Sequence, residues 1–152
     1  MTETRRLYYE DVYKKEFTAT VVECRERKKG YEVILDESAF YPEGGGQPCD
    51  LGTLGQAKVL DVREKDGTVF HTVDTPVEIG SSLPGVIDWD RRFDHMQQHS
   101  GEHIVSGMLC ARFTCDNVGF HMGEDLVTID YNADIPWDAL QEVEAAANRY
   151  FL

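Results

Sequence analysis

The sequence predicts an α+β protein in which a small antiparallel β-barrel, residues 1–89, precedes an α+β domain, residues 90–152. Between residues 17 and 89, segments rich in β-branched and aromatic residues alternate with turn residues, which is typical of a small barrel or sandwich. From residue 91 to 112 there is no proline, and apolar residues recur at helical spacing. A chain of 152 residues is long enough to bury a core, as one domain or as two small ones.

The strands are predicted from the turns that separate them. "FTATVVECR" and "YEVILDE" flank the turn "ERKKG" and form a first hairpin. "AKVLDVRE" and "TVFHTVD" flank the turn dipeptide Asp66-Gly67 and form a second hairpin. The segment "TPVEIGSSLPG" is rich in turn residues, and "VIDW" is predicted as the closing strand.

Beyond the first helix, the sequence predicts two strands and a second helix. The strands are "FTCDNVGFHM" and "DLVTIDYN", joined through Gly123. Asp134 is the predicted cap of the second helix, and Pro136 lies near its first turn. The apolar stripe of that helix consists of Leu140, Val143 and Ala147. Because the helix is predicted to run to Leu152, we expect the second domain to be incomplete at its C-terminus.

Charge and composition restrict the partners. The net charge of −13 counts against broad contact with a phosphate backbone, so a nucleic acid is expected at the more basic N-terminal side or through few contacts. The basic run "RERKK" is interpreted as a solvated hairpin tip. The apolar runs are too short to span a membrane, and residues 1–30 contain no signal-like stretch. Four scattered cysteines then predict free thiols, and we expect a cytoplasmic protein with no membrane partner.

Three of the five histidines lie in the stretch "HMQQHSGEH". On a helix, residues four apart share one face with β-carbons about 6 Å apart, so His99 and His103 can direct their imidazoles at one metal ion. His95, one turn earlier, is a candidate third ligand, hydrogen-bond donor to a ligand, or substrate contact. Two helical ligands do not complete a zinc shell, so further ligands must come from elsewhere in the fold.

The same residues allow a second interpretation. "HSGEH" has the H-x-x-E-H pattern of inverzincin metallopeptidases, in which the glutamate is the general base beside zinc. Glu102 would then be the base of a zinc peptidase. Because it is next to His103 along a helix, Glu102 is alternatively expected to face water or to cap a neighbour.

The segment "AFYPEGGGQPCDLGTL" contains the second candidate cluster. The glycines Gly44, Gly45 and Gly46 let the backbone approach a ligand closely and adopt positive φ angles. Tyr41 and Gln47 bracket them with a stacking group and a hydrogen-bonding group. We therefore assign these five residues to substrate binding.

The chain resembles the editing module of alanyl-tRNA synthetases and the free-standing alanyl-tRNA editing proteins of the AlaX type. "FYPEGGGQPCDLGTL", followed by "RRFDHMQQHSGEH", is similar to the family's glycine-rich motif and H-x-x-x-H zinc pair, and "GFHMGEDLVTIDYN" resembles the segment that follows them. The resemblance implies a β-barrel followed by an α+β editing domain shared with threonyl-tRNA synthetase. The family completes its zinc shell with a later Cys-x-x-x-His, which this sequence lacks.

The function that the resemblance implies is zinc-dependent hydrolysis of mischarged seryl- or glycyl-tRNA for alanine. Zinc would be held by His99 and His103, and the partner would be the aminoacylated 3′ end of tRNA. We assign Gln47, Ser100 and His95 to catalysis, with Gln47 orienting water or the ribose and Ser100 accepting the hydroxyl of the substrate serine. A homodimer is also possible.

A third interpretation is a non-catalytic tRNA-binding module. Gly45-Gly46-Gln47 is the tripeptide that release factors use on peptidyl-tRNA esters. The flanking "FYPE" and the histidine helix fit the editing family better.

Overall fold

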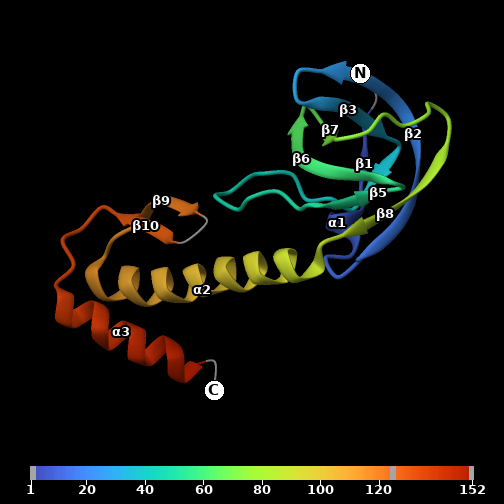
Figure 1. Cartoon of the computed structure of the whole chain (residues 1–152). Coiled ribbons are helices and arrows are strands. Elements are labelled where there is room, and N and C mark those ends of the chain that lie inside the picture. The colour runs from blue at the N-terminus through green and yellow to red at the C-terminus, as the bar shows by residue number, and fades with distance from the viewer. Residues whose placement is uncertain (1–2, 124–125, 151–152) are drawn as a thin grey trace. The chain divides into compact units, whose positions relative to one another are not determined.

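A computed structural model describes residues 3–123 and 126–150. The chain divides into two compact units (Figure 1). Unit 1 contains Met1–Gly44 and Pro48–Arg92, and unit 2 contains Gly45–Gln47 and Phe93–Leu152. Among the described residues, no helix is long and apolar enough to cross a membrane.

Unit 1 is a closed β-barrel of six strands, and every neighbouring pair is antiparallel (Figure 1). In order around the barrel, the strands are β2 (Glu16–Arg27), β3 (Gly30–Leu35), β7 (Thr68–Val73), β6 (Ala57–Lys65), β5 (Gly52–Leu54) and β8 (Ser82–Ile87). The predicted barrel is therefore confirmed, and the sandwich alternative is wrong because β8 pairs back to β2.

The two predicted hairpins are β2–β3 and β6–β7. Asp66 and Gly67 both have positive φ angles, 51° and 83°, as a two-residue hairpin turn with right-handed strand twist requires. Alternate side chains of these strands point inward and fill the barrel. The most deeply buried apolar residues are Val21, Val33, Leu35, Phe40, Leu54, Val62, Val69 and Val73.

Several elements of unit 1 differ from the prediction. The closing strand β8 begins at Ser82, inside the segment interpreted as turn-rich, and it accommodates Pro84 opposite Thr18. Trp89, predicted in that strand, instead starts a helix. The additional elements are β1 (Arg5–Arg6), α1 (Leu7–Glu10), β4 (Glu37–Ser38) and β5, and β1 pairs with β4 in parallel.

Unit 2 is built on most of the long helix α2 (Trp89–Phe113), which begins in unit 1. Two antiparallel strands follow, β9 (Asn117–Met122) and β10 (Val127–Tyr131), and then helix α3 (Trp137–Tyr150). This order confirms the predicted α+β character of the fold, since two helices accompany the sheet. The cysteines are free thiols, as predicted.

The second predicted helix needs one correction. The Leu140 N–H donates to the Pro136 carbonyl and the helix begins at Trp137, so Pro136 rather than Asp134 stands at its N-terminal boundary. Its buried face includes Val143 and Ala147, as expected. The predicted extension to Leu152 lies outside the described residues.

Candidate metal centre and glycine turn

Helix α2 places His99 and His103 on one face, as their spacing requires. The two imidazole rings are nearly parallel, with centroids 5.0 Å apart and planes 12° apart. Each of these histidines offers one ring nitrogen as a ligand atom, and Glu102 offers a carboxylate oxygen. The three ligand atoms lie within 4.8 Å of one another. His103 is exposed, whereas His99 is half-buried. The ring of His99 lies beside that of Phe120, with the two ring centroids 5.3 Å apart.

The glycine segment forms a tight turn whose tip belongs to unit 2. Gly45 and Gly46 have φ angles of 60° and 81°, a pair of values typical of a type I′ turn and open to few residues other than glycine. The Gly46 carbonyl accepts a hydrogen bond of 3.1 Å from the Met122 N–H. A side chain on Gly46 would overlap the carbonyl oxygen of Phe120, so the turn can pack against β9 only with glycine at this position.

Gln47 connects the glycine turn to the histidine pair. Its side chain is buried, and its Oε1 accepts a hydrogen bond of 3.0 Å from Nδ1 of His99. A proton on Nδ1 leaves Nε2 of His99 as the nitrogen with a lone pair. Histidines that bind metals generally donate their second ring nitrogen in this way, which fixes both the tautomer and the orientation of the ring.

Glu102 is buried, contrary to the expectation that it faces water. Its Oε1 accepts hydrogen bonds from the Ser106 hydroxyl, at 2.7 Å, and from the amide of Asn117. Its Oε2 lies 3.5 Å from Nδ1 of His103. Tyr131 extends the network through its hydroxyl, 2.8 Å from Ser106, and burial raises the pKa of this tyrosine. The carboxylate is thus held in one orientation beside His103.

The remaining predicted site residues lie in different places. Ser100 is exposed on α2, directly after His99. His95 is half-buried one turn before His99 and does not belong to the group of three ligand atoms found among the described residues. Tyr41 belongs to unit 1, where its ring packs at 5.4 Å against Tyr8 and burial raises its pKa.

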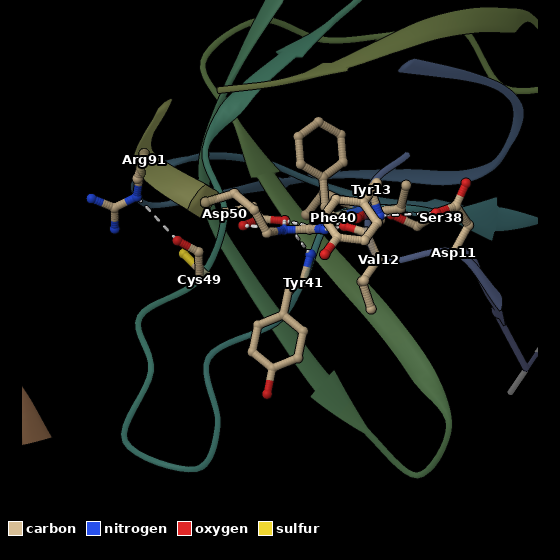
Figure 2. A network of polar contacts seen from close by, with 12 residues as sticks. Asp11, Val12, Tyr13, Ser38, Phe40, Tyr41, Cys49, Asp50 and Arg91 are labelled. Atoms are coloured by element: carbon tan, nitrogen blue, oxygen red, sulfur yellow. Dashed lines mark hydrogen bonds and ion pairs between the residues drawn. The ribbon is translucent and has the colours of Figure 1, made fainter. Parts of the chain in front are cut away.

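The base of the glycine segment contains charged residues that sequence reasoning missed. Arg92 and Asp50 form a buried ion pair within unit 1. Asp50 also accepts a hydrogen bond of 2.8 Å from the Tyr41 N–H (Figure 2). The two residues are 42 positions apart, so no local spacing reveals the pair. The available signal was an arginine in the first turn of α2 and an aspartate just after the glycine turn.

The donor set fits zinc. Two imidazole nitrogens and one carboxylate oxygen are ligand types that zinc accepts, and the hydrogen bond from His99 to Gln47 is the support that a zinc ligand normally receives. His99 and His103 account for two positions of a tetrahedral shell.

Comparisons with known proteins identify the family. A model described as tRNA synthetases class II (A) matches residues 2–91, more than half of the chain, and the chain belongs to this family. Within it, the chain is similar to alanyl-tRNA editing proteins and to alanine–tRNA ligases, the proteins that its two motifs resemble.

Three relatives illustrate this relationship. The chain is 36% identical over 154 residues to the alanyl-tRNA editing protein AlaX-L of Pyrococcus horikoshii, covering 97% of the chain and 38% of the relative. It is 33% identical over 153 residues to the alanyl-tRNA editing protein Aarsd1 of Rattus norvegicus, covering 91% and 37%. It is 40% identical over 161 residues to the alanine–tRNA ligase of Pyrococcus abyssi, covering 98% and 17%. The chain therefore spans less than two fifths of the length of each relative.

Proposed function

We propose that this chain contributes to alanyl-tRNA editing, the hydrolysis of tRNA for alanine that carries serine or glycine. The observation that carries the proposal is the hydrogen bond between Gln47 and His99, because it joins the glycine turn to the histidine pair. The similarity to alanyl-tRNA editing proteins supports the same conclusion.

The reaction is the attack of water on an activated ester. Water adds to the carbonyl carbon, the bond from that carbon to the ribose oxygen breaks, and free amino acid and uncharged tRNA result. Such a step needs positioning and charge stabilisation more than it needs a covalent nucleophile. Zinc, when bound, would supply positive charge that polarises the ester or lowers the pKa of water.

The chain's own residues then have distinct roles. His99 and His103 would hold the metal, and Gln47 orients His99 while Glu102 lies beside His103. The Gly44–Gly46 backbone and Tyr41 keep their assignment to substrate binding. His95 keeps its assignment to catalysis.

Two alternatives remain to be separated by experiment. A zinc peptidase would use Glu102 as its base, but this carboxylate is buried and held by Ser106 and Asn117, which suits a positioning role better. A non-catalytic tRNA-binding module would use the glycine turn without turnover. The membership of the chain in a tRNA synthetase family favours tRNA over a peptide as the substrate.

The test measures bound zinc and seryl-tRNA hydrolysis in the full-length protein. We expect His99→Ala and His103→Ala each to lower zinc content and to reduce hydrolysis at least about 1,000-fold, because each removes a ligand. His121→Ala is the matched control, since His121 is an exposed histidine on β9 outside the donor group, and it should leave both quantities unchanged.

Other results would reject the proposal. Cleavage of a peptide panel that is lost in Glu102→Gln would establish the peptidase. Tight tRNA binding without turnover, in the presence and absence of zinc, would establish the binding module. Full hydrolysis in the His99→Ala protein would exclude the histidine pair from the reaction.

A further inference from the structure

Helix α2 ends in a turn that brings the chain back onto the last helical residues. Thr114, directly after Phe113, has a φ angle of 51°, in the left-handed region that β-branched residues rarely adopt. The Cys115 N–H donates to the Cys110 carbonyl at 3.4 Å. A left-handed residue after the helix and a backbone hydrogen bond of this span are features of the Schellman motif. That motif commonly brings the side chains of the two bonded residues into contact.

In this turn, both residues in contact are cysteines. Their sulfur atoms lie 3.3 Å apart, and closing this gap by about 1 Å gives the length of a disulfide bond. Both cysteines belong to unit 2, whereas Cys24 and Cys49 belong to unit 1. The turn therefore presents two thiols to each other without a rearrangement of the fold.

The two thiols differ in accessibility. Cys110 is half-buried, whereas Cys115 is only 8% exposed, so a reagent in solution reaches Cys110 first. Desolvation raises the pKa of the Cys110 thiol to about 11, although a hydrogen bond from the Asn117 N–H opposes the shift. Because the thiolate is the reactive form, Cys110 reacts slowly at neutral pH and faster in alkaline solution.

The cysteine pair adjoins a residue that orients Glu102. Asn117 is the first residue of β9, two positions after Cys115, and its side-chain amide donates to Oε1 of Glu102. Between them, the Asp116 N–H donates to the side chain of Asn132 at 2.7 Å. A covalent bond from Cys115 to the helix would therefore restrict the position of Asn117.

We infer that Cys110 and Cys115 form a modification site, which a small-molecule disulfide such as oxidised glutathione converts into an intramolecular disulfide. The Cys110 thiolate attacks one sulfur of the reagent, forms a mixed disulfide and releases one molecule of reduced glutathione. The Cys115 thiolate then attacks the Cys110 sulfur and releases the second molecule. The cysteines are oxidised, and the reagent takes up their two hydrogens as two thiols. The inference does not depend on the proposed function.

The first experiment equilibrates the full-length protein with reduced and oxidised glutathione at about pH 8.5, near the pKa of an unperturbed thiol. Peptide mass spectrometry then locates the disulfide and measures its yield. We expect a bond between Cys110 and Cys115, with an equilibrium constant at least about 10-fold larger in the folded protein than in urea, because the fold holds the thiols together. Equal constants, or a bond that uses Cys24 or Cys49 instead, would overturn the inference.

The second experiment tests the order of attack. Cys115→Ala removes the thiol that resolves the mixed disulfide, so this protein should retain one glutathione on Cys110. Cys24→Ala is the matched control, a half-buried cysteine of unit 1, and it should form the intramolecular bond as the parent does. A Cys115→Ala protein that takes up no glutathione would contradict the role of Cys110 as the attacking thiol.

The third experiment tests the turn itself. Thr114→Gly keeps the left-handed conformation without its steric cost, and we expect the equilibrium constant to stay within about 2-fold of the parent. Thr114→Pro fixes φ near −65° and should lower the constant at least about 10-fold. Equal constants in these two proteins would show that the turn does not bring the sulfurs together.

The last readout is amide hydrogen exchange in β9. Oxidation of the parent should slow this exchange about 10-fold, because the disulfide limits local opening of the turn. A protein with both Cys110→Ala and Cys115→Ala should exchange equally before and after the same treatment. Unchanged exchange in the oxidised parent would refute the restriction of Asn117.

Discussion

The surroundings of one histidine in each unit distinguish the barrel from the helical unit. In the barrel, His71 is completely buried, its Nδ1 donates to the Val33 carbonyl at 3.0 Å, and its Nε2 accepts from the Ser38 hydroxyl at 2.7 Å. In unit 2, the Nδ1 of His99 donates to Gln47, and the ring is only partly buried. Protein atoms thus satisfy both nitrogens of His71, whereas within the described part of the chain only Nδ1 of His99 has a hydrogen-bond partner.

On the proposed function, His71 supports folding and His99 supports chemistry. The Ser38 hydroxyl that binds His71 also accepts the Phe40 N–H, so this histidine belongs to a closed polar network within the core. A network of this kind stabilises one arrangement of the core and leaves no site for a substrate. A ring held by one nitrogen is oriented and still available, which is the requirement for a metal ligand.

The largest expected effect is a loss of folding stability when the barrel histidine, His71, is replaced. His71→Ala should lower the free energy of unfolding by about 4 kcal/mol, because it leaves a cavity and an unpaired Ser38 hydroxyl in the core. Its zinc content per folded molecule should remain that of the parent protein. Urea denaturation combined with metal analysis measures both quantities.

The matched variant for this comparison is His103→Ala, which removes an exposed side chain. Its stability without metal should stay within about 0.5 kcal/mol of the parent, since few surface substitutions exceed that value. A loss of stability as large as that of His71→Ala would show that the histidine pair of unit 2 also supports folding.

The next effect concerns pH. Burial lowers the pKa of His71 to about 4, although its hydrogen bond to Val33 opposes the shift. Between about pH 6.5 and pH 4, the unfolded chain binds a proton at His71 and the folded chain does not. The stability that depends on a neutral His71 is therefore fully present above about pH 6.5. It is lost as the pH falls toward about 4, and the total loss is about 3 kcal/mol.

Urea denaturation at several pH values tests this dependence. The parent protein should lose more stability between about pH 6.5 and 4 than His71→Leu, which has no imidazole to protonate. Parallel curves for the two proteins would show that His71 does not contribute to the acid sensitivity of the barrel.

The sequence predicted those features that depend on local spacing. The hairpins, the barrel and the helix of His99 and His103 follow from periods of two and of 3.6 residues and from turn dipeptides. The two-residue strands β1 and β4 are too short for any period to show. Strand β8 was predicted too short because Pro84 and Gly85 have the composition of a turn.

Buried polar contacts between residues distant in sequence could not be predicted in the same way. Arg92 and Asp50 meet across 42 positions, and Glu102 meets Asn117 only after β9 folds back along α2. Such contacts depend on tertiary packing, which local patterns do not encode. The roles of Ser100 and His95 in catalysis stay predictions, as does the binding of zinc.

The smallest expected effect concerns the choice between serine and alanine. If Ser100 accepts the hydroxyl of the substrate serine, Ser100→Val should lower the ratio of seryl- to alanyl-tRNA hydrolysis about 10-fold, close to the value of one hydrogen bond. The effect should be modest because Ser100 is exposed, so water replaces part of the lost contact. Ser100→Thr is the matched control, since threonine has the shape of valine and keeps the hydroxyl. An unchanged ratio in Ser100→Val would assign the selectivity to other residues, while an equal loss in Ser100→Thr would indicate that shape rather than hydrogen bonding at position 100 determines it.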